Sequence, residues 1–479
     1  MSATRRTTAC VAGIAVIAVL VVALAALRIG NPRDARAGSI SVEREVVDRD
    51  LGDSAELSAQ ASVTFPLRVS NNKRYLVDAN GRPFLIHGDT SWSLIAQLRR
   101  GDAWHYLDDR RDRGFNTILV NLLEHKFSSN PPANAYGNEP FLVRGDFTTP
   151  NEAYFAHADA VIRQARKRGI LVLLVPAYLG YGGGSEGWYQ KMVANGSTKL
   201  RRYGEYLGKR YSNMKNILWV HGGDYNPPRM ELVSAIVNGI RKFDTDGLHT
   251  MHCAPEFSAF ECAGTQGWLD INNVYTYGAV VDDALPAYKR KPNMPYFLME
   301  SNYENEHNVT ERRLRTQAHQ ANLSGAAGQI FGNNPIWHFD GPGLDPVPIT
   351  WKQALSGTGS KSMMQLRKLF DNTAWERLRP DSNGAFLVSG QGGGLDRAVA
   401  AYSEKHSLGL VYVPTSRVIT LDLRKLTEPK VKARWFDPAN GKYRNIAGSP
   451  FTTDRKKAFR SPGNNSSNSG DWVLVLKPV

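Results

Sequence analysis

Two carboxylates follow short apolar runs, and side chains of this type in this position could carry out acid–base or nucleophilic chemistry. Asp224 comes after Ile217–Val220 and a His-Gly-Gly turn, whereas Glu300 follows Tyr296–Met299 directly. Apolar runs of this length are typical of buried parallel strands. In a barrel of alternating strands and helices, parallel strands end on one common face, where catalytic residues lie. We therefore expect Asp224 and Glu300 to meet at that face.

A pair of carboxylates at one site suits the hydrolysis of glycosides. One protonated carboxyl donates its proton to the leaving oxygen, and the other carboxylate attacks or stabilises the anomeric carbon. Positions at the ends of a fourth and a seventh strand fit the roughly 5 Å separation of retaining enzymes. An Asp after Gly-Gly is also common in turns and helix caps. Rival carboxylates follow other apolar runs, at Glu124, Glu256 and Glu304.

Aromatic and polar side chains near the other strand ends would suit a sugar. Aromatic faces stack on the apolar faces of sugar rings, and Asn, His and Asp side chains bond hydroxyl groups. The pair His87 and Asp89 could equally be a hydrogen-bonded structural pair, and some of the aromatic residues must belong to the core. The predicted substrate-binding residues are His87, Asp89, Trp92, Asn121, His125, Tyr178, His221, Tyr225, Tyr275, Tyr277 and Trp337, with Tyr181, Trp188 and Tyr303 as further aromatic residues near strand ends.

The pattern around these residues predicts an α/β fold. Eight apolar runs alternate with amphipathic helices, which matches a (β/α)₈ TIM barrel over residues 67–378 in both number and length. From Ser382 the runs are short and separated by turns, which predicts a C-terminal antiparallel β-sandwich over residues 379–479. The eight expected barrel strands are residues 84–86, 116–123, 170–175, 217–220, 250–253, 273–277, 296–299 and 328–331.

The N-terminal region reads as a targeting segment. Arg5-Arg6 precede an uncharged apolar run over residues 9–27, so residues 1–29 are expected to be a signal peptide or a signal anchor, followed by a polar linker over residues 30–66. Either alternative exports the rest of the chain to a periplasmic or extracellular location, with residues 9–27 as a membrane tether in the second. Cys253 and Cys262 could pair in an oxidising compartment or remain two buried thiols.

The charge of the chain bears on its partners. The formal net charge is +14, and residues 376–479 carry 17 Lys and Arg against 9 Asp and Glu. Nucleic-acid binders usually cluster basic residues on one helix or stripe. The dispersed charge argues against nucleic acid and favours an acidic polysaccharide or envelope surface. No CxxC or HExxH spacing occurs, so no metal or organic cofactor is expected. The oligomeric state is open, with a monomer expected.

Four segments together resemble the apiosidase-like glycoside hydrolases. They are Phe84-Leu85-Ile86-His87-Gly88-Asp89-Thr90-Ser91-Trp92, Gly114-Phe115-Asn116, Trp219–Asp224 and Met299-Glu300-Ser301. Trp435-Phe436-Asp437-Pro438 and Asp471-Trp472-Val473-Leu474 resemble the β-sandwich that follows the barrel in that family. The similarity covers roughly Leu67 to Val479. It implies a retaining glycosidase, with Asp224 as acid/base and Glu300 as nucleophile, although many barrel glycosidases carry Asn-Glu where this chain has Gly-Asp.

Two other functions remain open at this point. A non-catalytic carbohydrate-binding barrel would keep the aromatic residues but would not need both acids. A structural or adhesive envelope protein would act through the basic C-terminal domain. The presence of both Asp224 and Glu300 favours an exported glycosidase that acts on side chains of a plant-derived or envelope polysaccharide.

Overall fold

The computed structural model describes residues 63–479. The predicted signal or anchor segment and most of the predicted linker therefore lie outside the described residues. Between residues 63 and 479, none of the helices has both the length and the apolar character needed to cross a membrane.

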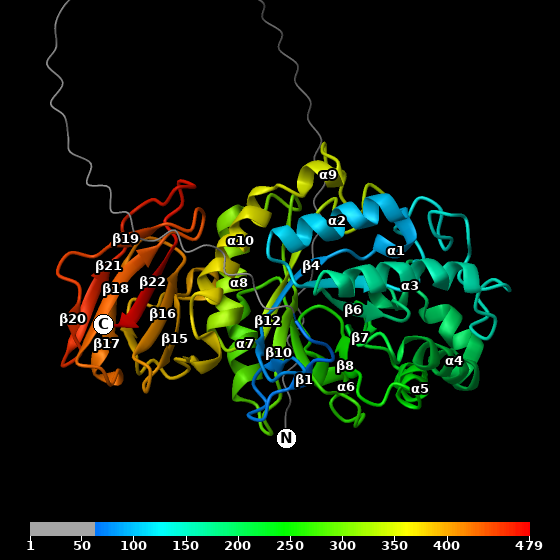
Figure 1. Ribbon diagram of the computed structural model, residues 1–479, viewed down its shortest axis with the longest axis horizontal. Helices are drawn as coiled ribbons and strands as arrows, with labels where there is room; N and C mark the ends of the chain where they lie inside the picture. The colour runs from blue at the N-terminus through cyan, green and yellow to red at the C-terminus, as the bar shows by residue number, and fades with distance from the viewer. Residues whose placement is uncertain (1–62) are drawn as a thin grey trace, which may run out of the picture. The chain divides into compact units, whose positions relative to one another are not determined.

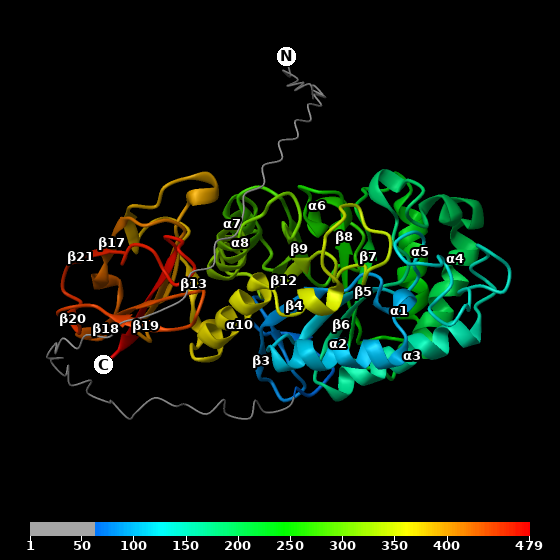
Figure 2. The same ribbon diagram turned by 90° about the horizontal axis from the view of Figure 1, so that it is seen from above.

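Eight parallel strands form the near-closed barrel that the sequence predicts (Figures 1 and 2). Hydrogen-bonded neighbours follow the order β8, β7, β6, β5, β4, β12, β10, β9, so that β8 and β9 flank the seam. Side chains that alternate along the strands fill the interior, as Ile86, Leu218 and Val220 do. The strands are β4 (Ile86–Thr90), β5 (Thr117–Asn121), β6 (Leu171–Val175), β7 (Ile217–Gly222), β8 (Leu248–His252), β9 (Asn272–Tyr275), β10 (Tyr296–Glu300) and β12 (Gly328–Asn333).

Helices cover the outside of the barrel and connect its strands. Asn151 caps α3 through its side chain, which accepts a hydrogen bond from the Ala153 N–H. Helices α4 and α5 can pack closely because Gly204 has no side chain. A Cβ at this position would lie 2.2 Å from the Ile236 carbonyl oxygen. The helices are α1 (Leu94–Gln97), α2 (Arg100–Asp112), α3 (Glu152–Lys167), α4 (Tyr189–Tyr211), α5 (Met230–Arg241), α6 (Ala259–Ala263), α7 (Val280–Lys289), α8 (Glu311–Leu323), α9 (Trp351–Ala354) and α10 (Thr358–Asp371).

The first barrel strand begins later than the sequence pattern suggests. Residues Pro83–Phe84 form β3 of a small antiparallel sheet with β1 (Arg68–Val69) and β2 (Leu76–Val77), because the turn at Gly81 folds the chain back. Strand β4 then runs from Ile86 to Thr90, so the expected strand over 84–86 is wrong by two residues at its start. His87 and Asp89 consequently lie within a strand and not at its end.

The C-terminal part consists of two antiparallel sheets. Apolar side chains of both, such as Ala433, Trp435 and Phe459, form a core between them. The sequence predicts strands there at residues 385–388, 398–402, 409–413, 419–423, 431–436 and 472–476, which correspond to β14, β15, β16, β17, β18 and β22. It does not predict β13, β19, β20 or β21, which are short or rich in charged residues. One sheet holds β13 (Arg379–Pro380), β15 (Val399–Ser403), β16 (Leu408–Val413), β22 (Trp472–Pro478), β18 (Lys430–Phe436), β19 (Tyr443–Asn445) and β20 (Phe451–Thr452); the other holds β14 (Leu387–Ser389), β17 (Val418–Asp422) and β21 (Lys456–Arg460).

Helix α8 packs on the larger of these sheets (Figure 1). Arg315 on α8 forms two hydrogen bonds with the Asp471 carboxylate, at 2.7 and 2.9 Å. Both side chains are buried, and the Tyr412 hydroxyl donates a further hydrogen bond to Asp471. Both oxygens of the buried Asp471 carboxylate therefore have hydrogen-bond partners. This ion pair fixes the contact between the barrel and the sandwich.

Candidate active site

A cavity of about 380 Å³ opens at the carboxyl ends of the barrel strands. Aromatic rings and carboxylates make up most of its wall, and no Lys or Arg of the described residues lines it. Such a combination of apolar rings and a few convergent polar groups is typical of ligand sites. The lining residues are Trp92, Asn121, Phe127, Tyr178, Tyr181, Glu186, Asp224, Pro255, Tyr275, Tyr277, Glu300, Tyr303, Glu306, Trp337 and Leu344.

Asp224 reaches the cavity because two glycines follow the body of β7. Gly222 and Gly223 have φ of +90° and +129°, and a Cβ on Gly222 would lie 2.2 Å from the His252 carbonyl oxygen. Asp224 also has a positive φ of 50°, which an Asp tolerates better than most residues. Its carboxylate accepts hydrogen bonds from the hydroxyls of Tyr178, at 2.6 Å, and Tyr275, at 2.8 Å.

Glu300 is the last residue of β10, and its side chain is almost fully buried. One carboxylate oxygen bonds Nε2 of His252 at 2.7 Å, and the other receives a long hydrogen bond of 3.5 Å from the Tyr277 hydroxyl. Burial raises the pKa of Glu300 and the charge of Asp224 raises it further, whereas the hydrogen bond from His252 lowers it.

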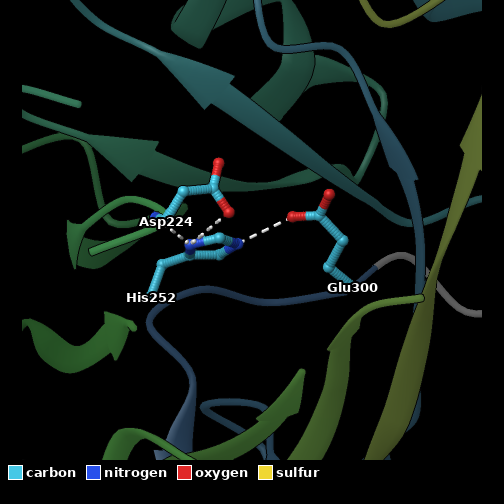
Figure 3. A group of neighbouring side chains, drawn as sticks. All are labelled: Asp224, His252 and Glu300. Atoms are coloured by element: carbon cyan, nitrogen blue, oxygen red, sulfur yellow. Dashed lines mark hydrogen bonds and ion pairs between the residues drawn. The ribbon is translucent and has the colours of Figure 1, made fainter. Parts of the chain in front are cut away.

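His252, at the end of β8, lies between the two carboxylates (Figure 3). Its Nδ1 accepts a hydrogen bond from the Asp224 backbone N–H at 3.0 Å. Nδ1 must therefore be unprotonated, so Nε2 carries the proton that is donated to Glu300. Burial lowers the pKa of His252, but the bond to Glu300 and the nearby charges raise it overall. A second proton on Nδ1 would nevertheless break the bond to Asp224.

His252 also holds the pair at a short separation. An oxygen of Asp224, an oxygen of Glu300 and a ring nitrogen of His252 all lie within 4.8 Å of one another. Three such groups could surround a metal ion, but both ring nitrogens already have hydrogen-bond partners. The hydrogen bonds account for the arrangement of these three side chains.

Tyrosine hydroxyls add a second connection between the carboxylates. Tyr275 bonds both Asp224 and, at 3.0 Å, the hydroxyl of Tyr277, which in turn contacts Glu300. Burial and the two carboxylate charges raise the pKa of Tyr275 far above its ordinary value. Burial likewise raises the pKa of Tyr178, followed by the charge of Asp224. These hydroxyls keep their protons at physiological pH and remain able to donate.

Two further carboxylates lie at the wall of the cavity. Burial and the charge of Glu300 raise the pKa of Glu306 to about 7, although the hydrogen bond from the Trp337 indole N–H, at 3.0 Å, lowers it. Glu186 accepts a hydrogen bond from the Tyr181 N–H and forms an ion pair with Lys126 at 3.4 Å. Neither residue directly follows an apolar run that predicts a barrel strand, so the sequence pattern does not indicate them.

Eight of the residues selected from the sequence come together in this cavity. They are Asp224, Glu300, Trp92, Asn121, Tyr178, Tyr275, Tyr277 and Trp337. Tyr181 and Tyr303, named from the sequence as further aromatic residues, also line it, and the Tyr303 hydroxyl accepts a hydrogen bond from the Trp92 indole. The structure adds His252, the final residue of β8, which bonds Glu300. The expected fifth strand, residues 250–253, contained His252, and its position at a strand end was the signal that could have identified it.

Five selected residues lie outside the cavity lining. His87, Asp89 and His221 are interior residues of strands whose side chains point toward the helices: His87 stacks on Phe115, Asp89 bonds Arg110 and Tyr106, and His221 bonds His249. His125 packs against Trp188, and Tyr225 packs against Tyr189. Successive side chains of a strand point to opposite faces, so a residue next to an inward-facing one points toward the helices. This alternation explains the placement of His87, Asp89 and His221.

The rival carboxylates have structural partners. Glu124 accepts hydrogen bonds from three successive backbone N–H groups, of residues 125–127. Glu304 accepts hydrogen bonds from Asn333 and from the Gly359 N–H at the start of α10. Glu256 accepts hydrogen bonds from the Thr276 hydroxyl and the Tyr277 N–H. Each of these three carboxylates holds a loop, and none of them lines the cavity.

Of the two alternatives for Cys253 and Cys262, the structure has the disulfide. The Cα atoms lie 6.6 Å apart, within the range of disulfides. Cys253 follows His252 directly, so the bond closes the loop that begins at the bridging histidine.

Comparison with known proteins places the chain in a family. A family model described as "Apiosidase-like, catalytic domain" matches residues 70–377, and one described as "Putative collagen-binding domain of a collagenase" matches residues 380–477. No curated protein matches the chain at a significant level.

Solved structures give a consistent result. The chain is 25% identical to a glycoside hydrolase family 5 protein from Bacteroides vulgatus ATCC 8482, with a TM-score of 0.76 over 87% of this chain and 95% of that one. A second structure, named glycoside hydrolase, is also 25% identical, with a TM-score of 0.76 over 87% of this chain and 98% of that one. Because the first family model matches well over half of this chain, the chain belongs to the family of apiosidase-like catalytic domains, and its structural relatives are glycoside hydrolases.

Proposed function

We propose that the protein is a retaining glycoside hydrolase in which Asp224 is the acid/base and Glu300 the nucleophile. The observation that carries this proposal is the His252 bridge, which holds the two carboxylates with oxygens within 4.8 Å in one cavity. Retaining enzymes have carboxyl groups about 5–5.5 Å apart, whereas inverting enzymes need about 6.5–9.5 Å to admit a water molecule. The short separation supports retention.

The reaction proceeds in two displacements. A Glu300 oxygen attacks the anomeric carbon while Asp224 gives its proton to the departing glycosidic oxygen, which leaves a covalent glycosyl-enzyme and an ionised Asp224. Asp224 then takes a proton from a water molecule that attacks the same carbon and releases Glu300. Two inversions return the original anomeric configuration.

The roles follow from the surroundings of each carboxylate. The Glu300 side chain is 8% exposed and accepts the Nε2–H of His252, which stabilises its ionised form as a nucleophile requires. The Asp224 side chain is 17% exposed, so it is better placed to meet a leaving group and incoming water. When Asp224 carries the proton, it can donate to Tyr275, and the chain through Tyr277 can then donate to Glu300.

The cavity suits a neutral sugar. Four carboxylates and no Lys or Arg of the described residues line it, and Glu186 alone of the four pairs with a lysine, Lys126, which lies outside the lining; an anionic sugar would therefore be repelled. Trp92 and Trp337 offer faces for stacking on a sugar ring. Oδ1 of Asn121 is buried without a hydrogen-bond partner among the described residues, and a sugar hydroxyl would supply one. These features favour a neutral sugar on a side chain of a plant-derived or envelope polysaccharide.

We also propose that the protein is exported. The apolar run at residues 9–27 supports a signal or a membrane tether, and the Cys253–Cys262 disulfide suits an oxidising compartment.

Substitution of the two acids tests the assignment. Glu300→Gln should reduce turnover by about a hundredfold or more on every substrate, since none can avoid the attack. Asp224→Asn should reduce turnover by a similar factor on a natural polysaccharide but less in the glycosylation step of an activated aryl glycoside, whose leaving group needs little protonation. Glu256→Gln, at a rival carboxylate, is the control and should keep most of the activity. Near-normal rates for either acid variant on a natural substrate would contradict the proposal.

A further inference from the structure

Four cationic side chains lie together on the larger sheet of the C-terminal domain. Lys430, Lys432 and Arg434 alternate along β18, and Lys477 is near the end of β22. Lys430 and Lys432 are exposed, and Arg434 and Lys477 are half-buried. We call these four residues the β18 basic row.

The register of the sheet forces like charges together within this row. Lys432 on β18 lies directly opposite Lys477 on β22, so their side chains emerge on the same face. Like charges in directly opposite positions of a sheet destabilise it. Burial lowers the pKa of Lys477, and the charge of Arg434 lowers it further. The row therefore costs the folded domain stability.

Between residues 63 and 479, none of the four cations forms an ion pair with an acidic side chain; Arg434 lies over the ring of Tyr443, and Lys477 donates to the Asn372 carbonyl. Some other cations of the same domain have acidic partners, as in the pairs Arg424–Asp422 and Arg455–Asp454, whereas others, such as Lys442 and Arg460, have no ion pair among the described residues. The direct opposition of Lys432 and Lys477 is what sets the row apart. A departure from local charge balance of this kind is expected where a surface binds a partner.

We propose that the β18 basic row binds an acidic polysaccharide. Alternate residues of a strand lie about 6.5–7 Å apart, so Lys430, Lys432 and Arg434 form a line suited to an extended chain with repeated carboxylates. An acidic polymer would neutralise the row and relieve the repulsion between Lys432 and Lys477. The polymer releases its own counterions on binding, which adds to the affinity at low salt.

The surface around the row favours this partner over others. Among the described residues of the C-terminal domain, the large hydrophobic side chains that are exposed are Leu395, Val418 and Val479, and none is aromatic. Single-stranded nucleic acid is held largely by stacking of bases on aromatic side chains. A folded protein partner would need a desolvated apolar or aromatic centre. A row of flexible cations without either suits a hydrated acidic glycan.

The binding can be tested with the full chain and immobilised polygalacturonate, with a neutral galactan as the comparison. Lys430→Thr combined with Lys432→Thr removes two charges from the row and keeps residues that favour strands. Lys456→Thr combined with Arg460→Thr removes two charges from the other sheet and is the matched control. We expect the row variant to bind about tenfold or more weakly with a shallower dependence on salt, and the control variant to change by less than about threefold.

Lys432→Glu separates a binding role from a structural one. The new carboxylate would face Lys477, so the unfolding temperature should rise while binding to polygalacturonate falls about as much as in the row variant, because both changes lower the charge of the row by two. Equal loss of binding in row and control variants would overturn the proposal, because net charge alone would then explain it. Equal binding of the neutral galactan, or displacement by DNA at lower concentration than by polygalacturonate, would also overturn it.

Discussion

His252 performs two tasks with two different nitrogens, and substitutions at this position can separate them. Nδ1 accepts the N–H of Asp224, and Nε2 donates to Glu300. In His252→Asn the side-chain oxygen can occupy the position of Nδ1 and accept the hydrogen bond from the Asp224 N–H, but the hydrogen-bond donor to Glu300 is lost. In His252→Gln the amide nitrogen can stand near the position of Nε2 and keep the donor, while the Asp224 N–H loses its partner.

The expected size of the effect follows from the lost hydrogen bond. A hydrogen bond to a charged group contributes about 1.5–3 kcal/mol. One pKa unit corresponds to about 1.4 kcal/mol, so the pKa of Glu300 in His252→Asn should rise by about 1–2 units. The nucleophile must be ionised, so the limb of kcat/KM that ascends with pH should move to higher pH by that amount. In His252→Gln this limb should stay close to its original position.

The measurement is kcat/KM against pH for the protein and both variants, with an activated aryl glycoside that depends little on Asp224. The same profiles on a natural substrate should reveal the second role of His252, which is to hold the Asp224 backbone through Nδ1. His252→Gln removes this hydrogen bond, so it should lower the rate on the natural substrate, which needs Asp224 as acid, more than on the aryl glycoside. An unshifted ascending limb in His252→Asn, or the same shift in both variants, would refute the assignment of tasks.

Two further predictions concern stability. Asp471→Ala removes the buried carboxylate that accepts two hydrogen bonds from Arg315 and leaves Glu311, at 3.2 Å, as its acidic partner. The free energy of unfolding should fall by about 3–5 kcal/mol in denaturant titration; a loss below about 1 kcal/mol would mean that the pair with Asp471 does not fix the contact between barrel and sandwich. The raised pKa of Glu306, about 7 against an ordinary value of 4.5, means that the folded state binds this proton more tightly. Stability attributable to Glu306 should therefore fall as the pH rises from about 4.5 to about 7, and the difference in unfolding temperature between the protein and Glu306→Gln should change across that window; a constant difference would argue against the raised pKa.

Much of the barrel could be predicted because its periodic signals are strong. Long runs such as residues 171–175 are buried on both faces and read as parallel strands from composition alone. Asp224 and Glu300 were predicted as site residues because they follow such runs closely, and both line the cavity. The sequence also predicts that Asn151 caps a helix over residues 151–168, because its side chain can accept a hydrogen bond from a backbone N–H of the first turn, and the structure confirms this cap.

The remaining errors have local physical causes. Apolar runs do not fix where a strand ends, so His87 and His221 were expected at the cavity, whereas each lies within a strand and faces the helices. Glu306 and Glu186 reach the cavity from loops, whose paths depend on tertiary contacts. His252 stood at a strand end, but its role depends on two hydrogen bonds to residues 28 and 48 positions away, which no local pattern encodes.

The stereochemistry of hydrolysis tests the central claim most directly. NMR of the first-formed product, recorded before the sugar equilibrates in solution, shows which anomer is released. Attack by Glu300 followed by attack of water predicts the same anomeric configuration as in the substrate. Release of the opposite anomer would mean that Glu300 activates water as a base, and the roles assigned to Asp224 and Glu300 would be wrong.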